Sequence, residues 1–314
     1  MSAKVSLVST VRNAAPHIEE FLASVRAQTR PPDEIVIVDG GSTDGTVEIL
    51  REASGVTFIE EPGSNIARGR NVAIRAATHD LIALSDADCV LEPLWLSLLL
   101  EALEDGADVA MGFYAPLTET FLQQCMSAVN LPDPEELRED RFMPSGRSVA
   151  FRRTAIDAAE GYPEWLDIGE DMFVDHRWRE LGMDMRLVPD ALAWWRLREG
   201  LTETWKQYYR YARGDAIAGM HAGRNAVRFA VYAGAAAVLL SSRRLPRLAA
   251  ASAGTTYTTK PIRRAFERIP GLPEKAAAIV AVPALMAFTD AAKMSGYLAG
   301  LPRRLSRSRR YGSR

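Results

Sequence analysis

Two aspartates one residue apart, Asp86 and Asp88, follow an apolar segment at residues 81–85 that has the composition of a buried strand. Carboxylates with this spacing at a strand end can share a divalent cation that also holds a diphosphate. Mg²⁺ and Mn²⁺ prefer oxygen ligands and commonly take one or two carboxylates together with substrate phosphates. Such a cation absorbs the negative charge that grows on a leaving diphosphate. The same pair is also typical of a turn or a helix start.

A second acidic segment, Asp39 to Thr46, reads D-G-G-S-T-D-G-T and follows the β-branched run 34–38. Asp39 at a strand end could accept hydrogen bonds from a base or a ribose, and the glycines would let the backbone approach a ligand closely. Glycine, serine and aspartate are also common turn residues. The segment lacks the G-x-G-x-x-G order of dinucleotide-binding folds, which argues against a dehydrogenase.

Strand and helix signals alternate over the first hundred residues. The expected strands are 5–11, 34–38, 56–59 and 81–84, and the expected helices are 18–28, a helix capped by Thr46, and 67–77. This alternation with short connections predicts an α/β fold with a mostly parallel sheet covered by helices on both faces. Ligands of such sheets gather beyond the carboxyl ends of the strands, which is where both acidic segments fall.

Further along, residues 116–141 are rich in Asp, Glu and Pro and are expected to form a mobile loop over the site. A strand is expected at 145–152 and a helix at 171–181. Residues 1–225 carry a net charge of −15 and residues 226–314 a net charge of +13. This asymmetry predicts two parts with different surroundings. We expect a catalytic domain over 1–225, with a nucleotide-binding half at about 1–115 and an acceptor half at about 116–225, and a helical, basic extension over 226–314.

Four motifs in order resemble family 2 glycosyltransferases, the inverting group with the GT-A fold. They are Thr10-Val11-Arg12-Asn13, the segment Asp39 to Thr46, Gly69-Arg70-Asn71, and Asp86-Ala87-Asp88. Ser145 to Arg153 and Gly161-Tyr162-Pro163 continue the match, which reaches about Tyr211 and covers roughly two thirds of the chain. The resemblance implies transfer of a sugar from a nucleotide diphosphate donor.

The resemblance also implies a role for each matching residue. Glu170-Asp171 is similar to the family's E-D pair, so Asp171 would be the general base that takes the proton of the acceptor hydroxyl. Gln207 to Tyr211 is similar to Q-x-x-R-W, and an arginine there can pair with phosphate. The implied donor contacts are Thr10, Arg12, Asn13 and Asp39 for the nucleoside, Arg70, Gln207 and Arg210 for the phosphates, Asp86 for the ribose or the metal shell, and Asp88 for the cation.

Two departures from the family pattern bear on the donor: Arg12 replaces an aromatic residue that stacks on the base, and Gly40 replaces a second acid. A third departure, Tyr211 in place of a tryptophan, leaves the role of that residue open. The sequence therefore does not separate a uridine donor from a guanosine or thymidine donor. Two other function classes remain open: a sugar-nucleotide pyrophosphorylase, whose glycine-rich basic loop is missing from residues 5–30, and a non-catalytic protein that binds nucleotide sugars or membranes.

The first residues lack the pattern of a signal peptide, and two scattered cysteines, Cys89 and Cys125, favour a reducing compartment. A cytoplasmic location is therefore expected. Residues 229–242 and 276–289 are each 14 residues without charge. A helix of that length covers roughly 21 Å, short of the ~30 Å hydrocarbon core, so neither is expected to span a membrane.

Basic clusters flank these apolar runs, a pattern that suits helices lying in the interface of an anionic membrane. We therefore expect peripheral attachment at the inner face of the membrane, which would favour a lipid-linked acceptor. Packing on the catalytic domain would also explain the pattern. The basic charge fits nucleic acid too, but no recognisable nucleic-acid-binding module is present. The lack of long spans favours a single transfer over processive synthesis.

Overall fold

The computed structural model describes residues 3–240 and 244–311, and the side chains within these ranges except at 239–253 and 305–314. The chain forms two compact units, Met1–Leu117 with Pro134–Arg196, and Thr118–Asp133 with Leu197–Arg314. These units differ from the predicted division at residue 225, because 118–133 and 197–225 belong with the C-terminal helices. The assignment of a catalytic domain and an extension stays a prediction.

The first unit is built on an eight-stranded sheet in the order β3-β2-β1-β4-β7-β6-β8-β5. Its strands are β1 (Val5–Val11), β2 (Glu34–Asp39), β3 (Thr57–Glu60), β4 (Leu81–Leu84), β5 (Cys89–Leu91), β6 (Val109–Leu117), β7 (Val149–Arg152) and β8 (Met185–Arg196). Strands β3, β2, β1 and β4 pair in parallel, and β7 runs antiparallel between β4 and β6. The carboxyl ends of β1, β2 and β4 therefore meet at one edge of the sheet.

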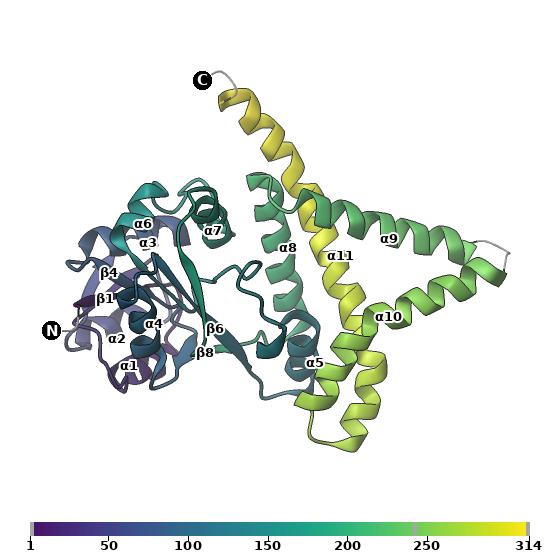
Figure 1. Ribbon diagram of the computed structural model, residues 1–314, viewed down its shortest axis with the longest axis horizontal. Coiled ribbons are helices and arrows are strands. Elements are labelled where there is room, and N and C mark those ends of the chain that lie inside the picture. Colours follow the sequence, from purple (N-terminus) through teal and green to yellow (C-terminus); the bar gives the residue numbers. More distant parts are fainter. Residues whose placement is uncertain (1–2, 241–243, 312–314) are drawn as a thin grey trace. The chain divides into compact units, whose positions relative to one another are not determined.

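Helices cover both faces of this sheet, as Figure 1 shows. The helices of the first unit are α1 (Ile18–Arg26), α2 (Thr46–Glu52), α3 (Ile66–Ala76), α4 (Trp95–Glu104), α6 (Arg153–Ala158) and α7 (Glu170–Glu180), with a short 3₁₀ turn at Pro134–Glu136. One apolar core joins α3, α6 and α7 to alternate residues of the central strands, with Phe151 and Trp178 among its largest buried side chains. The predicted α/β fold with a mostly parallel, helix-covered sheet is confirmed.

The second unit consists of helices only, among the residues that the structure describes. They are α5 (Phe121–Asn130), α8 (Leu201–Ala218), α9 (Ala222–Leu240), α10 (Arg244–Arg268) and α11 (Leu272–Tyr311). Helices α8 and α11 pack closely: a Cβ on Gly296 would lie 2.0 Å from the carbonyl oxygen of Tyr209, and one on Gly300 would lie 2.6 Å from that of Arg213. Small residues four apart on α11 let the two backbones approach, which is why α8 belongs to this unit.

The predicted mobile loop at 116–141 contains a helix, α5. Thr120 begins it with a capping box, in which the Thr120 hydroxyl accepts from the backbone N–H of Gln123 and the Gln123 side chain accepts from that of Thr120. Cys125 and Met126 are buried against α8, α10 and α11. The expectation of a loop was wrong because the flanking Asp, Glu and Pro residues dominate the composition of the segment.

Helix α11 is longer than the apolar run at 276–289 from which a short helix was predicted. Its part Leu272–Arg304 is long and apolar enough to cross a membrane by length and composition, and 33% of its most apolar window is buried. Core helices of soluble proteins share these properties. The estimate of 21 Å was wrong for this helix because the helix continues through charged residues at both ends. The basic clusters at 243–247 and beyond 304 lie outside the described side chains.

Candidate active site

The turns after β1 and β2 are joined by Asn13 and Ser42. The Asn13 side-chain oxygen accepts from the backbone N–H of Thr43 at 2.9 Å, and the Asn13 N–H donates to the Ser42 hydroxyl at 2.7 Å. Asn13 takes a left-handed backbone conformation, with φ of 55°. Asn is one of the few residues with a Cβ that adopt this conformation at all often. The two turns therefore form one surface at the carboxyl edge of the sheet.

Asp39 lies under this surface and is 1% exposed. One carboxylate oxygen accepts from the N–H groups of Gly41 and Ser42, each at 2.8 Å, and the other accepts from the Ser42 hydroxyl. Asp39 thus holds its own turn in shape. The predicted contacts of Asp39 with a base or ribose would add to these bonds.

The other residues predicted for the nucleoside differ in their surroundings. Arg12 is exposed at the surface. Thr10 is half-buried and packs against α3, where a Cβ on Gly69 would lie 2.8 Å from the Thr10 methyl group. A glycine at this point of α3 is therefore what lets the helix approach the end of β1. The structure brings Thr10, Asn13 and Asp39 to one edge, as predicted.

Arg70 connects the Asp86-Ala87-Asp88 motif to the Glu170-Asp171 pair. Its Nη2 lies 2.8 Å from Oδ1 of Asp86, and its Nη1 lies 2.7 Å from Oε1 of Glu170. The side chains of Arg70 and Glu170 are 3% and 4% exposed, so this bridge is buried. Burial acts against the charge, but the carboxylates of Glu170 and Asp86 raise the pKa of Arg70 above its ordinary value. The contacts of Arg70 are therefore with carboxylates, and its contact with phosphate stays a prediction.

Gly146 leaves the space that Arg70 occupies. A Cβ at position 146 would lie 2.0 Å from Nη2 of Arg70, so no other residue fits there without moving the guanidinium. The backbone N–H of Gly146 also points at Oδ2 of Asp171, at 3.5 Å. The backbone at Gly146, in the segment expected as an acceptor-side strand, therefore passes close to both Arg70 and Asp171.

Asp171 lies in the first turn of α7 and is half-buried. Its Oδ1 accepts from the N–H of Met172 at 2.8 Å. Gly169, with φ of 82°, begins the helix in the left-handed conformation that favours glycine. An acid at a helix N-terminus is also stabilised by the helix dipole. A half-buried carboxylate held in this way can accept a proton.

Two further carboxylates near Asp171 are buried. Burial, with the nearby charge of Asp171, raises the pKa of Glu170 to about 7, although Arg70 acts to lower it. Burial likewise raises the pKa of Asp175 well above its ordinary value, and its Oδ2 has no hydrogen-bond partner among the described residues. Sequence reasoning missed Asp175, and it interpreted Glu170 only as part of a motif. The signal available was their spacing of five along one helix, which does not reveal burial.

Asp88 lies against the aromatic side chain of Trp195. Its Oδ2 accepts from the indole N–H of Trp195 at 3.3 Å, and its Oδ1 lies 3.8 Å from the Cys89 sulfur. Trp195 is paired with Cys89 across strands β5 and β8. Two strands from distant parts of the sequence therefore position this carboxylate.

The described part of the chain contains no cluster of three or more His, Cys, Asp or Glu side chains suited to a metal ion. Asp86 and Asp88, two hard oxygen donors one residue apart, nevertheless fit Mg²⁺ or Mn²⁺, which take one or two carboxylates when substrate phosphates complete the shell. Asp86 is half-buried and keeps one oxygen that does not face Arg70. The donor set fits a cation shared with a diphosphate.

Gln207 and Arg210 lie on α8, in the second unit. Gln207 is 9% exposed and donates through its side chain to the Tyr211 hydroxyl at 2.9 Å, whereas Arg210 is exposed. The other predicted site residues belong to the first unit. Tyr211, the departure from the family pattern, is engaged by Gln207.

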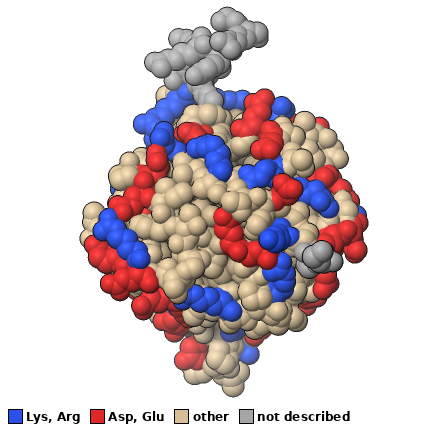
Figure 2. Space-filling view, turned by 90° about the vertical axis from the view of Figure 1, so that its left-hand side faces the viewer, with Lys and Arg blue, Asp and Glu red and all other residues tan. Residues whose placement is uncertain are grey.

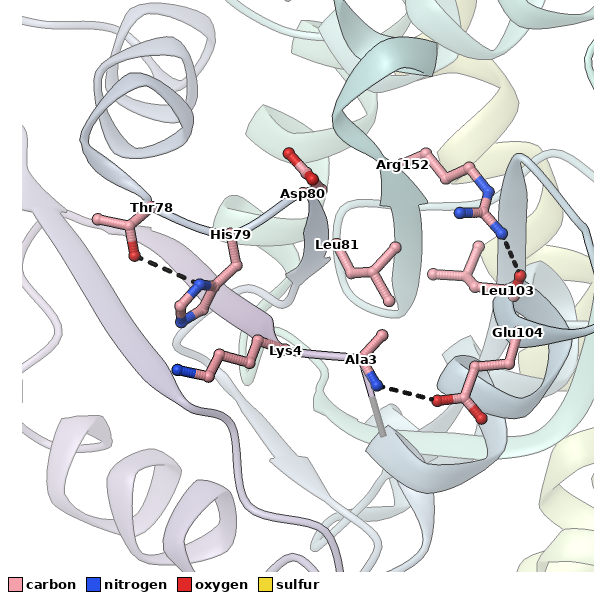
Figure 3. A pocket seen from close by; sticks show the side chains of 9 residues that line it. All are labelled: Ala3, Lys4, Thr78, His79, Asp80, Leu81, Leu103, Glu104 and Arg152. Atoms are coloured by element: carbon pink, nitrogen blue, oxygen red, sulfur yellow. Dashed lines mark hydrogen bonds between the residues drawn. The ribbon is translucent and has the colours of Figure 1, made fainter. Parts of the chain in front are cut away.

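Two cavities of the first unit lie away from the acidic motifs. One of about 390 Å³ lies beside Lys4, His79 and Asp80, at the start of β1 and β4 and hence at the opposite end of the strands (Figure 3). Another of about 690 Å³ lies between α3, α6 and the loop before α7, where Trp165 packs edge-on against Phe173. Neither includes Asp86 or Asp88.

The chain is similar in sequence to known proteins. A family model described as glycosyl transferase family 2 matches residues 6–142. Glycosyltransferase AglE of Haloferax volcanii is 26% identical over 222 residues, which are 67% of this chain and 72% of that protein. The match to the family model includes the motifs around Thr10, Asp39, Arg70 and Asp86.

Two solved structures are similar in fold. A mannosyltransferase from Pyrobaculum calidifontis, PcManGT, in complex with GDP-Man and Mn²⁺, has a TM-score of 0.53 and 19% sequence identity, covering 100% of this chain and 89% of that one. Residues 1–349 of TarS from S. aureus, in complex with UDP, have a TM-score of 0.50 and 17% identity, covering 99% of this chain and 92% of that one. Both likenesses concern the fold.

Proposed function

Because this chain belongs to glycosyltransferase family 2, we propose that it moves a sugar from a nucleoside diphosphate sugar to an acceptor hydroxyl with inversion at the anomeric carbon. In this proposal Asp171 is the general base and Asp86 and Asp88 hold a divalent cation. The sequence alone left two other function classes open, a pyrophosphorylase and a non-catalytic binding protein. Membership of the family argues against both.

The observation that carries the proposal is the Arg70 bridge. Arg70 ties Asp86, at the end of β4, to Glu170, the neighbour of Asp171 on α7. A donor sugar lies between its diphosphate and the attacking hydroxyl, so an inverting enzyme needs its phosphate site and its base at a fixed separation. A buried ion-pair bridge between rigid elements supplies that separation.

Asp171 suits the role of base because its orientation is fixed. The N–H groups of Met172 and Gly146 point at its two oxygens, so the carboxylate is held without a cationic partner among these contacts. It would accept the acceptor's proton as the hydroxyl oxygen attacks the anomeric carbon and the bond to the diphosphate breaks. When bound, the cation supplies positive charge for the departing diphosphate.

We propose that the nucleoside of the donor binds over the joined turns after β1 and β2, at Thr10, Asn13 and Asp39. Arg12 is exposed in the same segment as Thr10 and Asn13. Gln207 and Arg210 are proposed to contact the diphosphate or the acceptor. GDP-Man and UDP are bound by structures of similar fold, so both guanosine and uridine donors belong in any screen.

A test of the reaction is the release of nucleoside diphosphate from UDP-, GDP- and TDP-sugars, with Mn²⁺ or Mg²⁺ and with EDTA. Release from one donor is expected to need the cation and to fall roughly 100-fold in Asp88→Asn, since the lost carboxylate holds that cation. Asp80→Asn is the matched control, because Asp80 is an exposed carboxylate before β4, at the opposite end of the same strand. If calorimetry detects no binding of any of these donors and none is hydrolysed, the proposed function is wrong.

We further propose that the second unit attaches to an anionic membrane surface at the cytoplasmic face, so that the acceptor is lipid-linked. The observation that supports this is the exposure of large apolar side chains on its helices, with Val231 59% and Val280 75% exposed. Arg224 and Arg263 of the same unit are exposed too. A surface that presents both apolar and basic side chains suits a lipid interface. On the face in Figure 2, by contrast, Lys and Arg are interspersed with Asp and Glu, so that face presents no continuous basic stripe for nucleic acid.

Flotation with vesicles tests the membrane proposal. The full chain is expected to float with vesicles containing phosphatidylglycerol and to float less with neutral ones. The double variant Val231→Glu with Val280→Glu is expected to lose most of this binding, because both side chains are exposed and their replacement adds charge repulsion. Leu181→Glu, an exposed apolar position in the first unit, serves as the control. Equal recovery of all proteins in the soluble fraction would contradict the proposal.

A further inference from the structure

Arg147 lies in an aromatic corner beside Asp88. Its guanidinium carbon is 4.0 Å from the ring centre of Trp195 and 5.0 Å from that of Tyr114, and the two rings meet edge to face at 6.0 Å. The same Trp195 donates its indole N–H to Asp88. One tryptophan therefore contacts both a fixed cation and the carboxylate predicted to hold the metal.

The backbone fixes this arrangement. The Ser85 hydroxyl, one residue before Asp86, donates to the carbonyl of Arg147 at 2.9 Å, and Nη1 of Arg147 donates to the Ser145 hydroxyl at 2.8 Å. Arg147 is thus tied to the end of β4 on one side and stacked on β8 on the other. Stacking on an aromatic ring pre-organises a guanidinium, so less side-chain freedom is lost when it binds an anion.

Arg147 and the acidic pair are joined at two points. The Trp195 ring under the guanidinium donates to Asp88, and the Arg147 carbonyl accepts from Ser85, the residue before Asp86. Arg70 is buried between Asp86 and Glu170, and its two terminal nitrogens contact those carboxylates.

We propose that Arg147 binds the diphosphate of the donor, beside the cation at Asp86 and Asp88. This assignment rests on the proposed function. A guanidinium carries five N–H donors and pairs with phosphate oxygens in a planar, two-pronged contact. Arg147 stays protonated throughout, and its charge opposes the negative charge that the diphosphate gains as the glycosidic bond breaks. It is a phosphate-binding residue in addition to those that the sequence motifs indicated.

Calorimetry with UDP, GDP and TDP and with the matching monophosphates, all in Mn²⁺, tests the assignment. For the nucleotide that binds, Arg147→Gln is expected to weaken the diphosphate about 10- to 100-fold, the loss of one charge-assisted contact, and the monophosphate less than about threefold. Arg147→Lys, which keeps the charge, is expected to retain part of the diphosphate affinity. Arg177→Gln is the matched control, since Arg177 is half-buried and pairs within its own helix with Glu180.

Two results with Arg147→Gln would overturn this assignment alone. Unchanged affinity for the diphosphate would show that the guanidinium does not contact it. An equal loss for diphosphate and monophosphate would show that Arg147 only holds Trp195 and Asp88 in place. If the unaltered chain bound none of the nucleoside diphosphates, the proposed function would fall and this assignment with it.

Discussion

Asp171→Asn is expected to lower the turnover number about 10²- to 10⁴-fold, the range typical for loss of a general base, while leaving donor binding nearly unchanged. The amide is of the same size, and its oxygen can still accept from the N–H of Met172. It cannot accept a proton from the attacking hydroxyl. The measurement is the rate of nucleoside diphosphate release from the donor found in the screen, with its dissociation constant from calorimetry.

The control for Asp171→Asn is Asp167→Asn, an exposed carboxylate four residues earlier in the loop before α7. It removes the same charge from the same region without a place on the helix. A variant at 171 that keeps its turnover number within about threefold of the parent would remove Asp171 from the reaction. Loss of donor binding together with turnover would instead make it part of the donor site.

The order of the elements up to β4 follows from the sequence because it depends on local patterns. Apolar runs predicted the strands. The polar residues at or just after their ends, Asp39 and Asp86, predicted the edge of the sheet at which a ligand would bind. The expected helix at 18–28 and the expected strand at 81–84 agree with α1 and β4 within a few residues. The buried face of α1 and the fully buried run of β4 are sufficient to specify these two elements.

The site's interior could not be predicted in the same way, because its contacts join distant parts of the chain. Arg70 pairs with residues 16 and 100 positions away, and no local pattern distinguishes a buried arginine from one that faces a phosphate. Trp195 meets Asp88 because β8 pairs with β5, a strand of three residues. The aromatic corner around Arg147 depends on the same pairing.

In the second unit, helix α5 was missed although its sequence carries a local helix signal. Thr120 and Gln123 have the spacing of a capping box before an apolar segment, which is a helix start. The acidic residues on both sides outweighed it. The close packing of α8 on α11 depends on Gly296 and Gly300, whose spacing becomes informative only once the partner helix is known.

Arg70→Met is expected to lower the free energy of unfolding by about 3–5 kcal/mol, because it leaves the buried Glu170 carboxylate without its cation. Methionine fills a similar volume, so the loss reports the charge rather than a cavity. Chemical denaturation at several pH values measures it. The double variant Arg70→Met with Glu170→Gln is expected to recover part of the loss, since no unpaired buried charge then remains on Glu170, and the coupling follows from the cycle.

The pH dependence of the free energy of unfolding distinguishes an electrostatic role of the Arg70–Glu170 pair from a packing role. Burial raises the pKa of Glu170 to about 7 in the folded chain, above its ordinary 4.5. Between these values the folded state keeps a proton that the unfolded state has lost, so the stability of the parent is expected to fall as the pH rises through this window. Glu170→Gln should reduce that slope, with Asp175 contributing the remainder, because burial raises its pKa in the same direction.

Arg70→Met should move the window the other way, to higher pH, because Arg70 is what lowers the pKa of Glu170 against the effect of burial. The slope should therefore extend above pH 7 in this variant. Arg75→Met is the control, since Arg75 is exposed on the same helix, and it should change neither the stability nor its pH dependence appreciably. A loss in Arg70→Met that is independent of pH and is not recovered by Glu170→Gln would mean that Arg70 acts through packing, and the bridge would not be what sets the separation of Asp86 and Asp171.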